Sequence, residues 1–156
     1  MAISAKFDIS GKVAVVTGTS RGLGKGYAEG LAQVGAVVMC CGVSRDGMEA
    51  TAKAIRDAGG EAEAHVLDVL KPGESRRLFE EIAARRGRLD ILVNNAGTED
   101  ISDFVNVTEA QYDAIMGVNL RGTFFAAQAA ARIMMRQRAG KILNIEIGRA
   151  SCRERV

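Results

Sequence analysis

The chain has 156 residues, which suits one domain of ordinary size and is too short for two. Hydrophobic residues make up 47% and charged residues 26%, which excludes a disordered chain, and a formal net charge of +2 excludes the basic surface of a nucleic-acid-binding protein. No apolar run reaches the ~20 residues that a membrane span needs, so we expect a cytoplasmic protein with neither a membrane nor a nucleic-acid partner.

Short apolar runs alternate along the chain with segments of helical spacing. The runs predict strands at residues 13–16, 36–41, 62–67, 89–93 and 141–145. The segments between them predict helices at residues 22–34, 48–58, 72–86 and 108–137. Strands that alternate with helices of ten or more residues are typical of βαβ units, so we predict an α/β fold: a doubly wound parallel sheet with helices on both faces.

Two features of these elements bear on the setting of the protein. Cys40 and Cys41 lie within the second predicted strand and form no C-x-x-C motif, so we expect two small buried side chains in a reducing cytoplasm. Residues 124–131 of the last predicted helix are apolar nearly all round. We therefore expect either further chain or another subunit to cover the second face of this helix.

Three glycines lie between the first predicted strand and the first predicted helix, within residues 17–24. Gly18, Gly22 and Gly24 suit a dinucleotide, because such a turn needs a tight bend, close approach of the backbone to the pyrophosphate and close helix–strand packing. The helix N-terminus would then offer free N–H groups to the phosphates. The alternative interpretation is a turn that has only a structural role.

The end of the second predicted strand bears on the choice of cofactor. An acidic residue in this place would bind a ribose 2′-hydroxyl and favour NAD, but residues 39–43 contain none. Arg21 and Arg45 lie nearby in the sequence, and arginine binds phosphate through paired hydrogen bonds. We therefore predict NADP rather than NAD, the alternative being that both arginines are merely solvated.

Four motifs, in order, give the chain a resemblance to the short-chain dehydrogenase/reductase family over about residues 7–145. Residues 17–24 match the T-G-x-x-x-G-x-G motif of that family, and Asp68 with Val69 matches its D-V pair after the third strand. Residues 94–97 match its N-N-A-G motif, and Asn119 matches the catalytic asparagine of its long helix. The resemblance implies a Rossmann fold, and the first residues also resemble members that act on sugar acids or 3-oxoacyl thioesters.

The resemblance implies hydride transfer between a nicotinamide and a small-molecule carbonyl or alcohol, in a homo-oligomer (dimer or tetramer) without a metal. It makes Asn119 a catalytic residue that holds a water of the proton relay, although its side chain could instead bond locally within the helix. Asp68 would accept a hydrogen bond from the adenine amino group, Asn94 would tie neighbouring strands together, and His65 has no chemical role. The residues implied to bind the cofactor are Gly18, Ser20, Arg21, Gly22, Leu23, Gly24, Asp68, Val69, Asn95, Ala96 and Gly97.

The sequence departs from the family where its catalytic tyrosine and lysine belong. Tyr27 is followed four residues later by Leu31 and Tyr112 by Met116, so neither forms the Y-x-x-x-K motif. After the fifth predicted strand the sequence contains a single serine, Ser151. We therefore expect this chain itself to be inactive, whereas its parent is an oxidoreductase; the alternatives are a non-catalytic dinucleotide-binding module and a non-functional fragment.

The resemblance stops after Ile145. Residues 146–156 resemble a translated sequencing adapter, so we expect an incomplete dinucleotide-binding domain at residues 1–145 and a non-native tail at 146–156. A fold truncated after its fifth strand would expose Ile142, Leu143 and Ile145 at a sheet edge, and such an edge promotes aggregation. We accordingly expect a poorly soluble chain.

Overall fold

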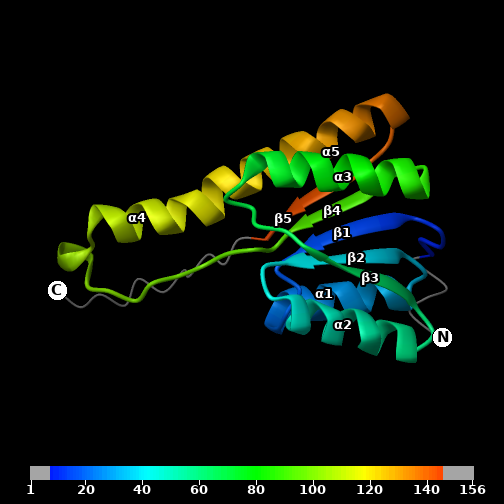
Figure 1. Ribbon diagram of the computed structural model, residues 1–156, viewed down its shortest axis with the longest axis horizontal. Helices are drawn as coiled ribbons and strands as arrows, with labels where there is room; N and C mark the ends of the chain where they lie inside the picture. The colour runs from blue at the N-terminus through cyan, green and yellow to red at the C-terminus, as the bar shows by residue number, and fades with distance from the viewer. Residues whose placement is uncertain (1–7, 146–156) are drawn as a thin grey trace.

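The computed structural model describes residues 8–145, and the tail predicted at 146–156 lies outside them. Five strands form one sheet in which every pairing is parallel, in the order β3-β2-β1-β4-β5 (Figure 1). The strands are β1 (Val13–Thr17), β2 (Val37–Gly42), β3 (Glu61–Val66), β4 (Ile91–Asn94) and β5 (Lys141–Asn144). The predicted doubly wound parallel sheet is confirmed.

Helices cover both faces of the sheet (Figure 1). On one face α1 (Gly22–Gln33) and α2 (Arg45–Asp57) pack on Ala14 and Val16 of β1. On the other face α3 (Pro72–Arg86) and α5 (Thr123–Gln137) pack on Val13 and Val15. Successive side chains of a strand point to opposite faces, so a strand between two helical layers is apolar at every position.

The second helix begins earlier than the sequence pattern predicts. We predicted residues 48–58, but α2 begins at Arg45, because the Ser44 hydroxyl accepts a hydrogen bond from Gly47 N at 3.4 Å and caps the helix. The remaining boundaries of the predicted strands and of the first three helices agree within two residues.

The long helix predicted at 108–137 is divided. It consists of α4 (Glu109–Met116), the π-helical segment η3 (Gly117–Gly122) and α5, and a short helix η2 (Phe104–Asn106) precedes it. A β-carbon on either glycine that bounds η3 would lie 2.9 Å from the side chain of Leu70 or Val69, so the chain passes very close to the segment after β3. Single π-helical turns inside α-helices occur frequently at functional sites.

The fifth strand lies at the edge of the described sheet. The exposed fractions of Ile142 and Leu143 are 37% and 47%, as predicted for an edge strand. The same prediction is wrong for Ile145, which is partly buried because it packs against the core on the α1 and α2 face. Asn94 Nδ2 donates a hydrogen bond to Asn144 Oδ1 at 3.0 Å, and Ile145 N donates to Asn94 O at 2.9 Å. The prediction that Asn94 ties neighbouring strands together is therefore confirmed.

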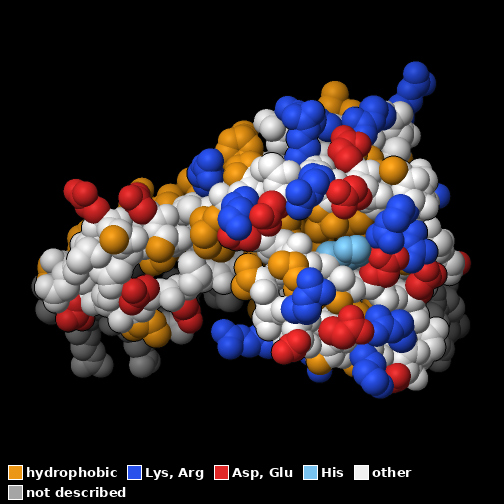
Figure 2. Space-filling view, in the orientation of Figure 1, with side chains coloured by type: hydrophobic (Ala, Val, Ile, Leu, Met, Phe, Trp, Pro, Cys, Tyr) orange, Lys and Arg blue, Asp and Glu red, His pale blue; other side chains and the backbone are white. Residues whose placement is uncertain are grey.

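The opposite edge of the sheet, β3, carries a cluster of charged side chains (Figure 2). Glu63 accepts hydrogen bonds from Arg85, at 2.8 Å, and from Arg86, and its Oε2 lies 3.0 Å from His65 Nε2. Burial by itself would raise the pKa of Glu63, but the hydrogen bonds and charges of the two arginines outweigh it and lower this pKa to about 2. Charged side chains on an outer strand also oppose pairing with another sheet.

Cys40 and Cys41 lie fully buried in β2, as predicted. Burial raises the pKa of Cys40 to about 11 and raises that of Cys41 further. Both thiols therefore stay protonated near neutral pH and behave as small apolar side chains. Within residues 8–145, no helix has the length and apolar character that a transmembrane segment requires.

Candidate cofactor site

A cavity of about 500 Å³ opens at the carboxyl ends of β1 and β4. The chain order reverses here, because β1 pairs with β2 on one side and with β4 on the other, and ligands of such sheets bind at this reversal. The lining residues come from the glycine-rich turn, the segment after β4, η3, α5 and the residue after β5. They are Arg21, Leu23, Asn95, Ala96, Gly97, Thr98, Glu99, Asn119, Thr123 and Ile145.

The structure thus brings six of the predicted site residues together around one cavity. The other predicted residues, which are Gly18, Ser20, Gly22, Gly24, Asp68 and Val69, do not line it. Ser20, Gly22 and Gly24 are direct sequence neighbours of Arg21 or Leu23, and Gly18 lies three residues before Arg21, so all four belong to the same region. Asp68 follows β3, and its Oδ1 accepts a hydrogen bond from Leu70 N at 3.0 Å. Val69 is buried against Gly122.

The three glycines of the turn meet distinct structural requirements. Gly18 and Gly22 have φ angles of 73° and 59°, in the left-handed region that favours glycine. A β-carbon on Gly24 would lie 2.2 Å from Gly18 O and 2.5 Å from Asn95 Nδ2, so α1 packs against the turn without room for a side chain. The predicted tight bend and close helix packing are both present.

The N-terminus of α1 is open to an anion. No side chain caps this helix, and its first turn contains no acidic residue. The backbone N–H groups of a first helical turn have no partner within the helix, and the helix dipole places partial positive charge there. The turn can therefore bind a phosphate group through its backbone.

A buried threonine that sequence analysis did not single out joins the turn to the segment after β4. Thr17 is 1% exposed, and its Oγ1 accepts hydrogen bonds from Asn95 N at 3.0 Å and from Ala96 N at 2.9 Å. Asn95 Nδ2 in turn donates to Thr17 O at 3.0 Å and to Gly18 O at 3.2 Å. Asn95 lines the cavity, but its amide nitrogen holds the glycine-rich turn in place.

Asn119 lies in η3 and binds the backbone of Thr98. Its Nδ2 donates to Thr98 O and its Oδ1 accepts from Thr98 N, both at 2.9 Å. The alternative of a bond within its own helix is therefore wrong, because the partner lies 21 residues away. The side chain fixes the segment after β4 against η3, and the predicted water of the proton relay stays a prediction.

Arg21 and Arg45 lie at the two helix N-termini next to the turn. Arg21 lines the large cavity, and Arg45 lines a smaller one of about 190 Å³ beside β3. Within residues 8–145, neither guanidinium forms an ion pair with a carboxylate. Both charges therefore remain available to an anionic ligand.

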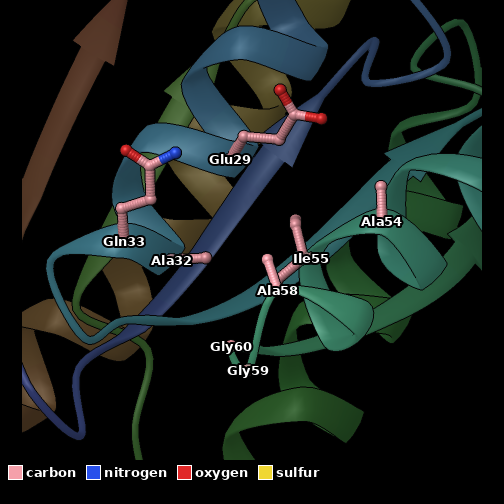
Figure 3. A pocket seen from close by; sticks show the side chains of 8 residues that line it. All are labelled: Glu29, Ala32, Gln33, Ala54, Ile55, Ala58, Gly59 and Gly60. Atoms are coloured by element: carbon pink, nitrogen blue, oxygen red, sulfur yellow. The ribbon is translucent and has the colours of Figure 1, made fainter.

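A further cavity of about 470 Å³ lies between α1 and α2, and it contains none of the predicted site residues. Figure 3 shows that Glu29 and Gln33 extend from α1, whereas the other lining residues, apart from Ile55, are alanines and glycines. The lining residues come from the later turns of α1 and α2 and from the segment that follows α2, away from the carboxyl edge of the sheet. We therefore assign the candidate site to the cavity beside the glycine-rich turn.

The chain is similar to known proteins in sequence and in fold. The family described as short chain dehydrogenase matches residues 12–151. A 3-oxoacyl-[acyl-carrier-protein] reductase of Thermotoga maritima is 33% identical over 88% of this chain and 56% of its own length. Two solved structures, each 36% identical with a TM-score of 0.84, are a metagenomic short-chain oxidoreductase in complex with NADP and a gluconate 5-dehydrogenase from Burkholderia cenocepacia in complex with NADP and tartrate.

The matches cover most of this chain but only part of each relative. The chain spans about half the length of the curated relative, at 56%. The match to the metagenomic structure takes in 88% of this chain and 63% of that structure. The match to the gluconate 5-dehydrogenase takes in 92% of this chain and 56% of that structure.

Proposed function

This chain belongs to the short-chain dehydrogenase/reductase family of oxidoreductases, and on that premise we propose that residues 1–145 are the cofactor-binding part of an NADP-dependent enzyme. The observation that carries the proposal is the cavity at the reversal of strand order, where the glycine-rich turn meets the segment after β4. A bound nicotinamide would supply hydride transfer to or from a small carbonyl compound or alcohol. The parent protein is then a dehydrogenase or reductase.

The residues present fit the phosphate groups of such a cofactor. The position of Gly24 leaves no room for a side chain between α1 and the turn. The N-terminus of α1 has no side-chain cap, so its backbone N–H groups are free to bind a phosphate. Gly18, Gly22 and the backbone between them would hold the pyrophosphate. We assign Asp68 to the adenine amino group and Asn95, Ala96 and Gly97 to the riboses.

We assign the selection of NADP over NAD to Arg21 and Arg45. Residues 39–43 contain no acid that would bind a ribose 2′-hydroxyl, and neither arginine forms an ion pair in the described chain. A guanidinium presents two parallel N–H donors to a phosphate. Two relatives of solved structure were crystallised with NADP, which supports the same choice.

We further propose that this chain binds the cofactor without turnover. Tyr27 and Tyr112 lie outside the cavity lining, and neither is followed four residues later by a lysine. The chain therefore lacks the pair in which a tyrosine donates the proton and a lysine lowers the pKa of that tyrosine. Asn119 would hold a water of the proton relay once those groups are supplied. The alternative of a non-catalytic dinucleotide-binding module predicts a parent sequence that also lacks them.

The exposed side of α5 supports a homo-oligomeric parent. Phe124 and Met135 have exposed fractions of 60% and 78%, and Leu120 of η3 is 59% exposed. Apolar area of this kind is normally buried against further chain or a second subunit. The buried, reduced state of Cys40 and Cys41 suits the cytoplasm.

Titration of the purified chain with NADPH and NADH, followed by nicotinamide fluorescence, tests the cofactor assignment. We expect saturable binding of both and tighter binding of NADPH. Arg21→Ala should weaken NADPH binding roughly tenfold or more, since it removes a charged hydrogen bond to phosphate, and should leave NADH binding nearly unchanged. Absence of binding of either nucleotide would contradict the proposal.

A further inference from the structure

Helix α2 is fastened to the glycine-rich turn by a buried hydrogen bond. Thr51 of α2 is 1% exposed, and its Oγ1 donates to Thr19 O at 2.8 Å. The same hydroxyl lies 3.2 Å from Gly47 O, the usual partner one turn back in a helix. The hydroxyl has one proton, and the shorter distance favours its donation to Thr19 O. The bond to Thr19 joins residues 32 positions apart, so it forms only through the tertiary fold.

Thr19 is the centre of the turn and is held from two sides. It is fully buried, its N donates to Cys41 O at 3.2 Å, and Gly18 N donates to the same carbonyl at 2.8 Å. These bonds attach the turn to the end of β2. The hydrogen bond from Thr51 attaches the turn to α2.

A second contact lies one helical turn before Thr51. A β-carbon on Gly47 would lie 2.7 Å from Ser20 Cβ, so the first turn of α2 rests directly on the residue after Thr19. Residues four apart lie on the same face of a helix. Gly47 and Thr51 therefore form one docking face on α2, and Thr19 and Ser20 form its counterpart on the turn.

This docking determines where two charges lie. Arg21 follows Ser20 directly, and Arg45 is the first residue of α2, two residues before Gly47. We propose that Thr51 is a positioning residue for cofactor selection: its hydrogen bond to Thr19 holds the first turn of α2, which carries Arg45, against the glycine-rich turn, which carries Arg21, and so sets how the two arginines meet a 2′-phosphate. The inference rests on the proposed function, and Thr51 itself is buried and does not line the cavity.

A purely structural role for Thr51 has a different signature. Loosening the turn as a whole would weaken the binding of NADP and the binding of NAD to the same extent, because both cofactors would place a pyrophosphate at the N-terminus of α1. Loss of the spacing between the two arginines weakens only the ligand with a 2′-phosphate. The ratio of the two dissociation constants therefore separates the two roles.

The test compares Thr51→Val with Thr51→Ser in the complete chain. Valine keeps the shape of the side chain without the hydroxyl, and serine keeps the hydroxyl. Isothermal titration with NADP and with NAD gives Kd(NAD)/Kd(NADP) for each variant. We expect the ratio to fall about fivefold or more in Thr51→Val, with NAD binding changed less than about twofold, and to be nearly unchanged in Thr51→Ser.

Each outcome decides the inference. A ratio in Thr51→Val equal to that of the unmodified chain, or equal weakening of both nucleotides, overturns the role of Thr51 and leaves the proposed NADP preference standing. An unmodified chain that binds both nucleotides equally contradicts the NADP preference and the inference with it. If Thr51→Val does not fold, Thr51→Ala serves instead, because it also removes the hydroxyl that bonds Thr19 O, and an unchanged ratio in that variant likewise overturns the role of Thr51.

Discussion

Replacing Gly24 with alanine places a methyl group between α1 and the glycine-rich turn. The new β-carbon would lie 2.2 Å from Gly18 O and 2.5 Å from Asn95 Nδ2, whereas ordinary van der Waals contact begins at 3.4 Å. Gly18 O is a backbone atom, so no side-chain rotation relieves the overlap. The helix and the turn must separate by about 1 Å, because a close-packed interior has no space to absorb the overlap.

The cost of this separation exceeds what alanine gains as a helix former. Overpacking of this kind costs about 1–3 kcal/mol, and backbone overlap belongs at the upper end of that range. Alanine within a helix is favoured over glycine by about 1 kcal/mol. We therefore expect Gly24→Ala to lower the free energy of unfolding by about 2 kcal/mol and to weaken NADPH binding more than tenfold.

Gly26→Ala is a matched control in the same helix. A β-carbon on Gly26 meets nothing within 4 Å, so this substitution should raise the free energy of unfolding by about 0.5–1 kcal/mol and leave NADPH binding unchanged. Urea unfolding followed by far-ultraviolet circular dichroism measures the first quantity, and nucleotide fluorescence measures the second. If the two variants unfold at the same urea concentration and bind NADPH equally well, the close-packing argument is wrong.

Three further predictions follow from buried and charged groups. Thr17→Val removes the acceptor of two backbone N–H groups and should lower the free energy of unfolding by about 2–4 kcal/mol, with Thr17→Ser close to unchanged; equal urea midpoints for the two variants would count against this. The pKa of Glu63 lies near 2 in the folded chain against an ordinary value of 4.5, so its stabilising effect is complete above pH 4.5 and is lost as the pH falls toward 2. Glu63→Gln should remove this part of the pH dependence, worth about 1–2 kcal/mol after solvent screening, in unfolding experiments between pH 2 and 6. Peptide mapping after iodoacetamide treatment should find Cys40 and Cys41 unmodified in the folded chain at pH 8 and modified in urea, and rapid native labelling of either would refute their burial.

The element order and the site region followed from local patterns in the sequence. Runs such as 13–16 are apolar at every position because a strand between two helical layers buries both faces. Gly18 and Gly22 indicated the turn because positive φ angles favour glycine at particular positions along the chain. The sequence pattern predicts the start of α2 three residues too late. Asp46 and Gly47 are residues typical of a turn, and whether Ser44 caps a helix depends on the backbone conformation around it.

The division of the long helix has a tertiary cause. The apolar spacing of 108–137 continues through residues 117–122, so sequence periodicity alone predicted one helix. In the fold, Gly117 and Gly122 pass close to Leu70 and Val69, and Asn119 binds the backbone of Thr98. These contacts accompany the π-helical turn, and none of them is visible in the local pattern.

Apolar runs and glycine spacing were sufficient to predict the α/β architecture and the position of the glycine-rich turn, because each reflects a backbone preference that acts within a few residues. Only the tertiary structure decided what holds that turn in its shape. Thr17 meets Asn95 across 78 residues and Thr51 meets Thr19 across 32. A threonine in a buried strand or helix looks the same in a sequence whether or not its hydroxyl has a distant partner, and the folding of the chain brings those partners within hydrogen-bond distance.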